Sequence, residues 1–170
     1  MKKILFFMTV ITFVSCTSKE PKQMTAQELD GVKNEIKNIS DQMLAAIDKL
    51  DLDTFFKDFS NSPEFLFIGS DGKSYDFQSY VDLSKEYIKP FSASRYILNK
   101  SDFRVLSNDL MLYIVYGTWD ITFSTGDQVK FDSYTINCLF KKIENQWKVI
   151  FLQESASPAV EIPKAVKEEK

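Results

Sequence analysis

Residues 110–124 read LMLYIVYGTWDITFS, and this stretch decides the fold because its residues alternate in character. The odd-numbered residues from Met111 to Phe123 are apolar except for Gly117, whereas the even-numbered residues are polar from Thr118 onward. A period of two is typical of a β-strand whose two faces meet different surroundings. The stretch therefore predicts a long strand that turns its odd-numbered side chains toward the core.

Three further stretches on either side of this strand have the same extended character. Polar or glycine-containing pairs separate them, and such pairs favour tight turns between neighbouring strands. Four long strands joined in this way predict an antiparallel meander. The other strands are expected at residues 95–106, 128–142 and 146–155, with turns at 108–109, 126–127 and 144–145.

The residues that precede the meander predict helices. Thr25 and Glu28 form a capping-box pattern, and apolar residues then recur at steps of three and four as far as residue 50, which indicates a long amphipathic helix. A short helix capped by Asp53, a strand at 64–68 with a hairpin, and a helix from Asp76 to Pro90 should follow.

The order of these elements and several short segments resemble the nuclear transport factor 2-like (NTF2-like) superfamily, and specifically its SnoaL-like branch. The resembling segments are 52–55 (LDTF), 67–72 (FIGSDG), 147–150 (WKVI) and 153–155 (QES), within residues 30–157. The resemblance implies an α+β, cone-shaped fold, with N-terminal helices packed on the concave face of a curved, mainly antiparallel sheet. It also implies a pocket between that face and the helices. Known members include isomerases, dehydratases, polyketide cyclases and proteins without catalysis.

Strand alternation predicts which side chains face this pocket. The expected lining combines aromatic walls with a few polar groups, as small-molecule sites usually do. For each aromatic residue the alternative is core packing, for Gln153 a structural hydrogen bond, and for Asp132 a solvated position. Relatives often carry a histidine where this chain has Gln153, and Glu154 would enter the pocket only if a β-bulge turned it inward. The predicted ligand-binding residues are Tyr80, Tyr87, Trp119, Phe123, Asp132, Tyr134 and Gln153.

Composition excludes several kinds of site. The chain has no histidine, and beyond Cys16 its one cysteine is Cys138, so catalytic triads that need histidine are excluded. A zinc site would lack its preferred ligands, and no metal or other cofactor is expected. Cys138 lies in an apolar strand and is interpreted as a small buried residue rather than a nucleophile. Without the first 16 residues the formal charge is −5, which disfavours nucleic acid as a partner.

The beginning and the end of the chain differ from the domain between them. Lys2 and Lys3, an apolar run over residues 4–14, and Ser15 before Cys16 resemble a bacterial lipoprotein signal peptide. We therefore expect a signal peptide over 1–16 with lipidation at Cys16, a tether over 17–24, the SnoaL-like domain over 25–157 and a disordered tail over 158–170. This predicts an exported protein of the cell envelope, anchored to a membrane by its N-terminal lipid.

Three functions fit these observations. The first is binding of a small apolar or aromatic molecule without chemistry, and the second is an isomerase, dehydratase or cyclase that uses a carboxylate and a tyrosine. The third is protein association through the other face of the sheet, which also contains apolar residues. Family members often form homodimers through that face; the alternative is that the tail covers it. The apolar residues expected there are Leu110, Leu112, Ile114, Tyr116, Leu139, Ile150 and Leu152.

Overall fold

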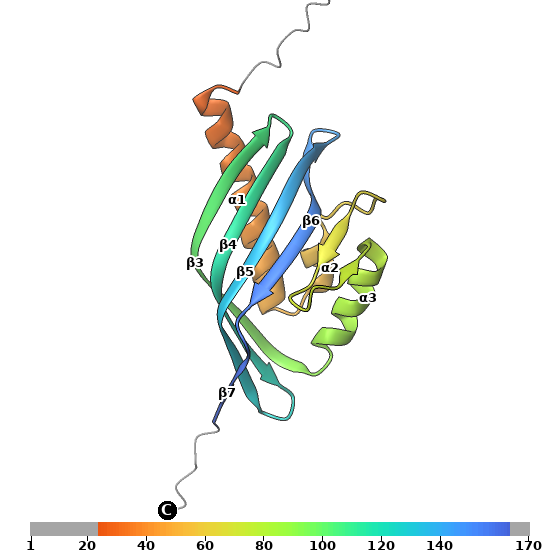
Figure 1. Ribbon diagram of the computed structural model, residues 1–170, viewed down its shortest axis with the longest axis vertical. Helices are drawn as coiled ribbons and strands as arrows, with labels where there is room; N and C mark the ends of the chain where they lie inside the picture. The colour runs from red at the N-terminus through yellow and green to blue at the C-terminus, as the bar shows by residue number, and fades with distance from the viewer. Residues whose placement is uncertain (1–23, 164–170) are drawn as a thin grey trace, which may run out of the picture.

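The computed structural model of the protein describes residues 24–163 and has helices on one side of a strongly curved sheet (Figure 1). The helices are α1 (Ala26–Asp48), α2 (Leu52–Phe56) and α3 (Phe77–Ile88). The strands are β1 (Leu66–Ile68), β2 (Ser74–Tyr75), β3 (Phe91–Ser107), β4 (Leu110–Phe123), β5 (Gln128–Ile143), β6 (Gln146–Ala156) and β7 (Val160–Ile162). The predicted signal peptide with Cys16, and the tether except Met24, lie outside the described residues.

Helix α1 begins where its sequence predicts. The Thr25 hydroxyl accepts a hydrogen bond from the Glu28 amide, and the Glu28 carboxylate accepts one from the Thr25 amide at 2.7 Å. These bonds satisfy backbone donors that the first turn of a helix otherwise leaves open. Ile36 and Met43, from the apolar stripe, are buried against the sheet.

The shorter helices follow, with one correction to a cap. Asp51, and not Asp53, caps α2, because its carboxylate accepts the hydrogen bond from the Thr54 amide at 3.1 Å. Asp76 caps α3 as predicted, with a 2.8 Å bond from the Ser79 amide. Pro90 lies just beyond the end of α3, where proline commonly follows a helix.

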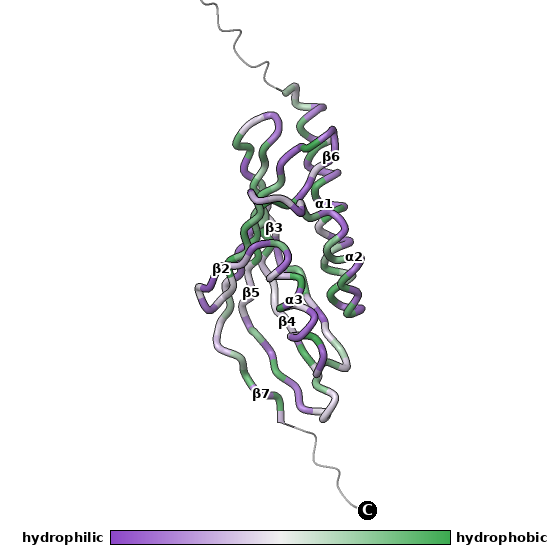
Figure 2. Tube along the Cα trace, turned by 90° about the vertical axis from the view of Figure 1, so that its right-hand side faces the viewer, coloured by the Kyte–Doolittle hydropathy of each residue, from purple (hydrophilic) through white to green (hydrophobic). Residues whose placement is uncertain are grey.

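The sheet has the order β2-β1-β6-β5-β4-β3, with β7 added beside β5. Its four long strands form the predicted antiparallel meander, whereas β1 runs parallel to β6 and pairs Phe67 with Leu152. Figure 2 shows α1 and α2 on one side of the sheet. The cone-shaped α+β fold expected from the sequence is confirmed.

The core lies between the helices and the concave face of the sheet. Phe140 and Val149 are fully buried there, and Trp147 is nearly so. A second apolar cluster surrounds Trp119 and Tyr134 further along the strands. The candidate site lies beside these clusters.

The convex face keeps part of its predicted apolar character. Leu112, Ile114 and Tyr116 are partly exposed there, but Leu152 is 1 % exposed and packs in the core, so its assignment to this face is wrong. Within residues 24–163 no helix is both long and apolar enough to cross a membrane.

The start of the predicted disordered tail is ordered instead. Val160–Ile162 forms strand β7, which pairs antiparallel with Gln128–Lys130 of β5. A free edge of β5 in this region offers backbone groups that the tail can pair with. The prediction of disorder from residue 158 is therefore wrong for this segment, whereas residues 164–170 lie outside the described part.

Candidate functional site

A cavity of about 410 Å³ opens between the concave face of the sheet and the helices. Its walls are mostly apolar and aromatic, and every long strand, all three helices and the β1–β2 hairpin contribute to them. Its size and character are those of a small-molecule site. The aromatic lining residues are Phe55, Phe67, Tyr75, Tyr80, Tyr87, Phe91, Tyr96, Trp119, Phe131 and Tyr134.

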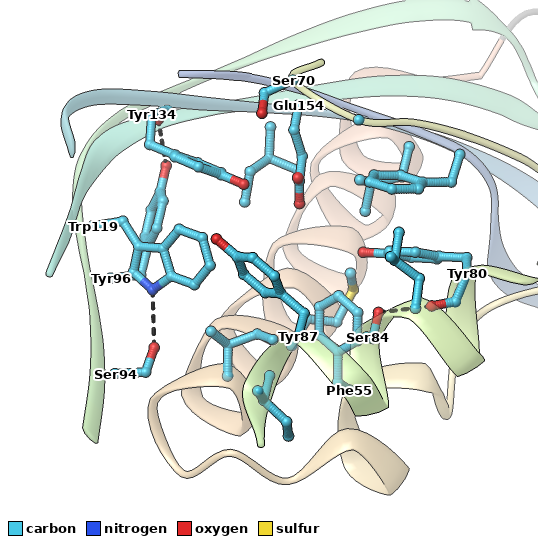
Figure 3. A pocket seen from close by; sticks show the side chains of 18 of the residues that line it. Phe55, Ser70, Tyr80, Ser84, Tyr87, Ser94, Tyr96, Trp119, Tyr134 and Glu154 are labelled. Carbon is cyan, nitrogen blue, oxygen red and sulfur yellow. Dashed lines mark hydrogen bonds between the residues drawn. The ribbon is translucent and has the colours of Figure 1, made fainter. Parts of the chain in front are cut away.

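One carboxylate projects into this cavity from the sheet, and it belongs to Glu154 of β6 (Figure 3). A β-bulge places it there. Phe140 pairs with Val149 and Leu139 pairs with Phe151, which leaves Ile150 as an extra residue in β6. An extra residue reverses the alternation of side chains beyond it. Glu154 therefore faces inward, although it would face outward in a regular strand.

The surroundings of Glu154 favour its neutral form. Burial among apolar side chains raises the pKa of Glu154 from 4.5 to about 7, because the ionised form loses hydration there. A hydrogen bond with the Tyr134 side chain partly opposes this rise. A carboxyl group poised near neutrality can accept and return a proton at ordinary pH.

Two tyrosines lie near this carboxylate. In Figure 3 the hydroxyl group of Tyr134 points toward Glu154, and the Tyr87 ring lies across the cavity with its hydroxyl group toward Tyr134 and Trp119. Tyr134 is buried, whereas Tyr87, on α3, is 48 % exposed and lies at the cavity mouth. Burial and the nearby Glu154 charge raise the pKa of both phenols, and burial is the larger cause. Both therefore remain protonated hydrogen-bond donors at neutral pH.

Two hydrogen bonds hold the aromatic wall next to the carboxylate. The indole Nε1–H of Trp119 donates to Ser94 Oγ at 2.9 Å, and the Tyr96 hydroxyl donates to the Tyr134 carbonyl oxygen at 2.9 Å. The Trp119 ring then packs edge-to-face on Tyr134, with centroids 4.9 Å apart. These contacts fix the rings and give the cavity a preformed wall.

The predicted site residues divide into two groups. Tyr80, Tyr87, Trp119 and Tyr134 line the cavity together. Phe123 lies outside the lining and packs against Phe91, with ring centroids 5.5 Å apart. Asp132 and Gln153 also lie outside the lining.

A bulge in β5 explains the position of Asp132. Gly117 pairs with Tyr134 and Trp119 pairs with Phe131, so two residues of β5 lie opposite Thr118 alone. Phe131 consequently lines the cavity, and the exposed Asp132 forms an ion pair with Lys130 at 3.1 Å. The expected pocket position of Asp132 is wrong, and the solvated alternative describes it.

The bulge in β6 explains the position of Gln153. Beyond Ile150 the odd-numbered residues of β6 turn away from the cavity, and the Gln153 side chain accepts a hydrogen bond from Asn137 at 2.6 Å. It also donates to Ser155 Oγ at 2.8 Å. Gln153 thus has a structural hydrogen-bonding role in the sheet, and its predicted pocket position is wrong.

Sequence alternation could not locate the β6 bulge. Residues 149–152 read VIFL, and four successive apolar residues carry no period from which a reversal could be detected. The signal that did exist is chemical: Glu154 is the one acidic residue in the strand predicted over residues 146–155. Cys138, by contrast, is buried as predicted, and burial raises the pKa of its thiol to about 12, so it is not a thiolate at neutral pH.

Comparison with solved structures finds proteins that have a similar fold. The chain resembles hexachlorocyclohexane dehydrochlorinase LinA-type3 from Novosphingobium barchaimii, with a TM-score of 0.72 at 9% identity, covering 83% of this chain and 97% of that one. A candidate scytalone dehydratase from Novosphingobium aromaticivorans aligns with a TM-score of 0.72 at 6% identity, covering 86% and 100%. An NTF2-like superfamily protein from Salmonella enterica aligns with a TM-score of 0.68 at 19% identity, covering 84% and 99%.

Comparison of the sequence itself finds no counterpart: no protein-family model and no curated protein matches the chain. The structural neighbours share the NTF2-like fold with this chain, and at these identities they share the fold alone.

Proposed function

We propose that the domain is an enzyme that moves a proton on a small, mainly apolar substrate, with Glu154 as the general base. The observation that carries this proposal is an inward-facing carboxylate in an aromatic cavity, with the Tyr134 hydroxyl group beside it and Tyr87 in the same cavity. Tyr134 and Tyr87 supply hydrogen bonds to the oxygen of the substrate. The sequence favoured binding without chemistry. The pair of Glu154 and Tyr134 favours the second function instead, which uses a carboxylate and a tyrosine.

The chemistry follows from these groups. The Glu154 carboxylate removes a proton from a carbon next to a carbonyl group, and the electron pair of that C–H bond forms the carbon–carbon double bond of an enolate. The carbonyl electrons move onto oxygen, which a tyrosine hydroxyl stabilises by donating a hydrogen bond. Glu154 then returns the proton to a different carbon of a conjugated enolate, or the carbonyl re-forms while a leaving group on the next carbon departs with its bonding electrons. In the second case Glu154 releases its proton to the leaving group or to water. The first outcome is an isomerisation and the second is an elimination.

The names of two structural neighbours agree with the second outcome. Dehydrochlorinase and dehydratase both denote eliminations, although those activities belong to the neighbours. The residues of this chain also favour proton transfer over covalent catalysis. The cavity contains no histidine to activate a hydroxyl nucleophile, and the Cys138 thiol is protonated at neutral pH.

Exchange of the α-protons of 2-tetralone, an uncharged aromatic ketone, tests the proposal. In D₂O the protein should accelerate loss of the α-proton signals in NMR spectra, and the rate should saturate with ketone concentration. The rate should rise with pH through about pH 7, because only the ionised Glu154 can accept a proton. An exchange rate equal to that with free acetate at the same concentration would contradict catalysis and favour binding without chemistry.

We also propose that the protein is anchored in the cell envelope through a lipid on Cys16. Its support is the lipoprotein-like segment over residues 1–16. Replacing Cys16 with alanine should abolish labelling by a fatty-acid analogue and release the protein from membranes. Cys138→Ala is the matched control and should keep both properties, since Cys138 is buried in the domain. Continued labelling of the Cys16 variant would rule out this anchor.

We also propose that the protein forms a homodimer through the convex face of its sheet. Leu112, Ile114 and Tyr116 are partly exposed there on β4, which lies next to the edge strand β3. The variant Ile114→Asp should be a folded monomer, because a dimer would bury the new charge without a partner. Light scattering measures the mass, and Thr118→Asp, further along the same face, is the control. An unchanged mass in both variants would argue against this interface.

A further inference from the structure

The charges that line the cavity do not balance. Among the described lining residues, Lys73 is the single cation, and its Nζ atom lies 2.8 Å from Asp71 Oδ2 in the exposed β1–β2 turn. The Asp71–Lys73 pair is therefore neutral as a unit. Glu154, deep in the cavity, has the Tyr134 hydroxyl group rather than a cation as its neighbour. When Glu154 ionises, the cavity carries one uncompensated negative charge.

A buried carboxylate of this kind requires compensation. Removing a charge from water is costly unless a counter-charge or a proton accompanies it. An anionic ligand would be repelled, and a neutral ligand would remove the remaining water without supplying a counter-charge. A cationic ligand supplies the missing charge.

The rings around Glu154 suit such a ligand. Trp119 lies 4.9 Å from Tyr134 and 6.3 Å from Tyr87, measured between ring centroids, and all three line the cavity. Aromatic faces carry partial negative charge and attract organic cations, most strongly when the ring is indole. Because its Nε1–H is already bonded to Ser94, the Trp119 indole is held in place before any ligand arrives.

We propose that the cavity binds a hydrophobic organic ammonium ion, with Glu154 as its counter-ion and the rings of Trp119, Tyr134 and Tyr87 as its walls. The inference uses the position of Glu154 but not its role as a base. It names a ligand class that the proton-transfer chemistry alone does not require. A quaternary ammonium group suits the aromatic faces, because they attract its charge without needing N–H bonds.

Phenyltrimethylammonium and tert-butylbenzene test this proposal, because they have nearly the same shape and differ in charge. Tryptophan fluorescence follows their binding, since Trp119 lies in the cavity wall. At about pH 8.5 the cation should bind at least about tenfold more tightly than the neutral molecule. At about pH 5, where Glu154 holds a proton, this preference should fall to the smaller part that the aromatic rings supply.

The pH dependence can be assigned to Glu154 because of what surrounds it. The other titratable residues that line the cavity are five tyrosines, Cys138 and the Asp71–Lys73 pair. Burial raises the pKa of Tyr80, Tyr87, Tyr96 and Tyr134 further above 10, and that of Cys138 to about 12. The ion pair lowers the pKa of Asp71 and raises that of Lys73, so neither changes charge between pH 5 and 8.5.

Variants complete the test. Glu154→Gln should show the same small preference at both pH values, equal to that of the wild type at pH 5, whereas Glu35→Gln, on the exposed side of α1, should behave as wild type. Trp119→Leu, whose binding is followed by ligand-observed NMR because the substitution removes the fluorescent reporter, should weaken binding of the cation more than binding of tert-butylbenzene. Equal or tighter binding of the neutral molecule to the wild type at pH 8.5, or a preference in Glu154→Gln that still rises between pH 5 and pH 8.5, would overturn the proposal. If the wild type prefers the cation as expected but does not accelerate the exchange of 2-tetralone protons, the result would count against the proposed catalysis alone.

Discussion

Replacing Glu154 with glutamine is expected to slow the exchange of 2-tetralone α-protons by about 10²- to 10⁴-fold, the usual contribution of a general base. Glutamine has nearly the same size and can still interact with Tyr134, but its amide cannot accept the proton. The loss should appear in the maximal rate more than in the ketone concentration that gives half of it. NMR exchange rates at about pH 8, measured over a range of ketone concentrations, separate the two quantities.

Two further variants define the cause of this loss. Tyr134→Phe removes one hydrogen bond to the developing negative oxygen and should slow exchange by a smaller factor, roughly tenfold to a hundredfold. Glu35→Gln removes a carboxylate from the exposed side of α1 and should leave the rate unchanged. A Glu154 variant that retains the wild-type rate would contradict the role of this residue as the base.

The same substitution is expected to stabilise the fold at about pH 8. The pKa of Glu154 is raised from 4.5 to about 7 in the folded protein, so folding favours its protonated form. Below pH 4.5 both the folded and unfolded states hold this proton, and ionisation costs nothing. Between the two pKa values the unfolded state releases the proton first, so the free energy of unfolding falls as pH rises. Above about pH 7 Glu154 is ionised in both states, and the folded state bears the full cost of the buried charge.

The size of this cost follows from the pKa difference. Each pKa unit corresponds to about 1.4 kcal/mol, which would give about 3 kcal/mol for this shift, and the partial exposure of Glu154 reduces the expected cost to roughly 2 kcal/mol. Glutamine has no charge to bury. The free energy of unfolding of Glu154→Gln should therefore exceed that of the wild type by this amount near pH 8 and equal it near pH 4.

Urea unfolding at both pH values checks the prediction. Asp51, Asp71 and Asp76 have lowered pKa values, because each carboxylate accepts hydrogen bonds, and they make the wild type less stable in acid. Since they are present in both proteins, the difference between wild type and variant isolates Glu154. An equal difference at pH 4 and pH 8 would show that the carboxyl group is not buried as described.

Much of the fold was predictable because its signals are local and periodic. The capping box at Thr25 and the apolar stripe that follows it define α1, and the turn pairs mark the ends of the long strands. Strand β4 matches its alternation throughout, with Met111, Tyr113 and Trp119 buried, because it contains no extra residue. The pairing of Val160–Ile162 with β5 was not predictable, since it depends on a distant strand edge and not on the local sequence.

The candidate site was predictable only where the strands are regular. Trp119 and Tyr134 were found from alternation, whereas the bulges in β5 and β6 moved Asp132 and Gln153 outward. A bulge replaces each predicted residue with its neighbour, so Phe131 and Glu154 line the cavity instead. Bulges often re-aim side chains near functional sites. Here the bulge at Ile150 turns the central carboxylate of the proposed chemistry inward.

A ¹³C NMR titration of the Glu154 side-chain carboxyl group, assigned by its absence from Glu154→Gln, tests most directly whether this carboxyl group is a base whose pKa is raised by burial. The carboxyl signal should titrate with a pKa of about 7, and it should move to a lower pKa when phenyltrimethylammonium fills the cavity. A pKa near the ordinary 4.5 would mean that Glu154 is hydrated, and it would contradict the account.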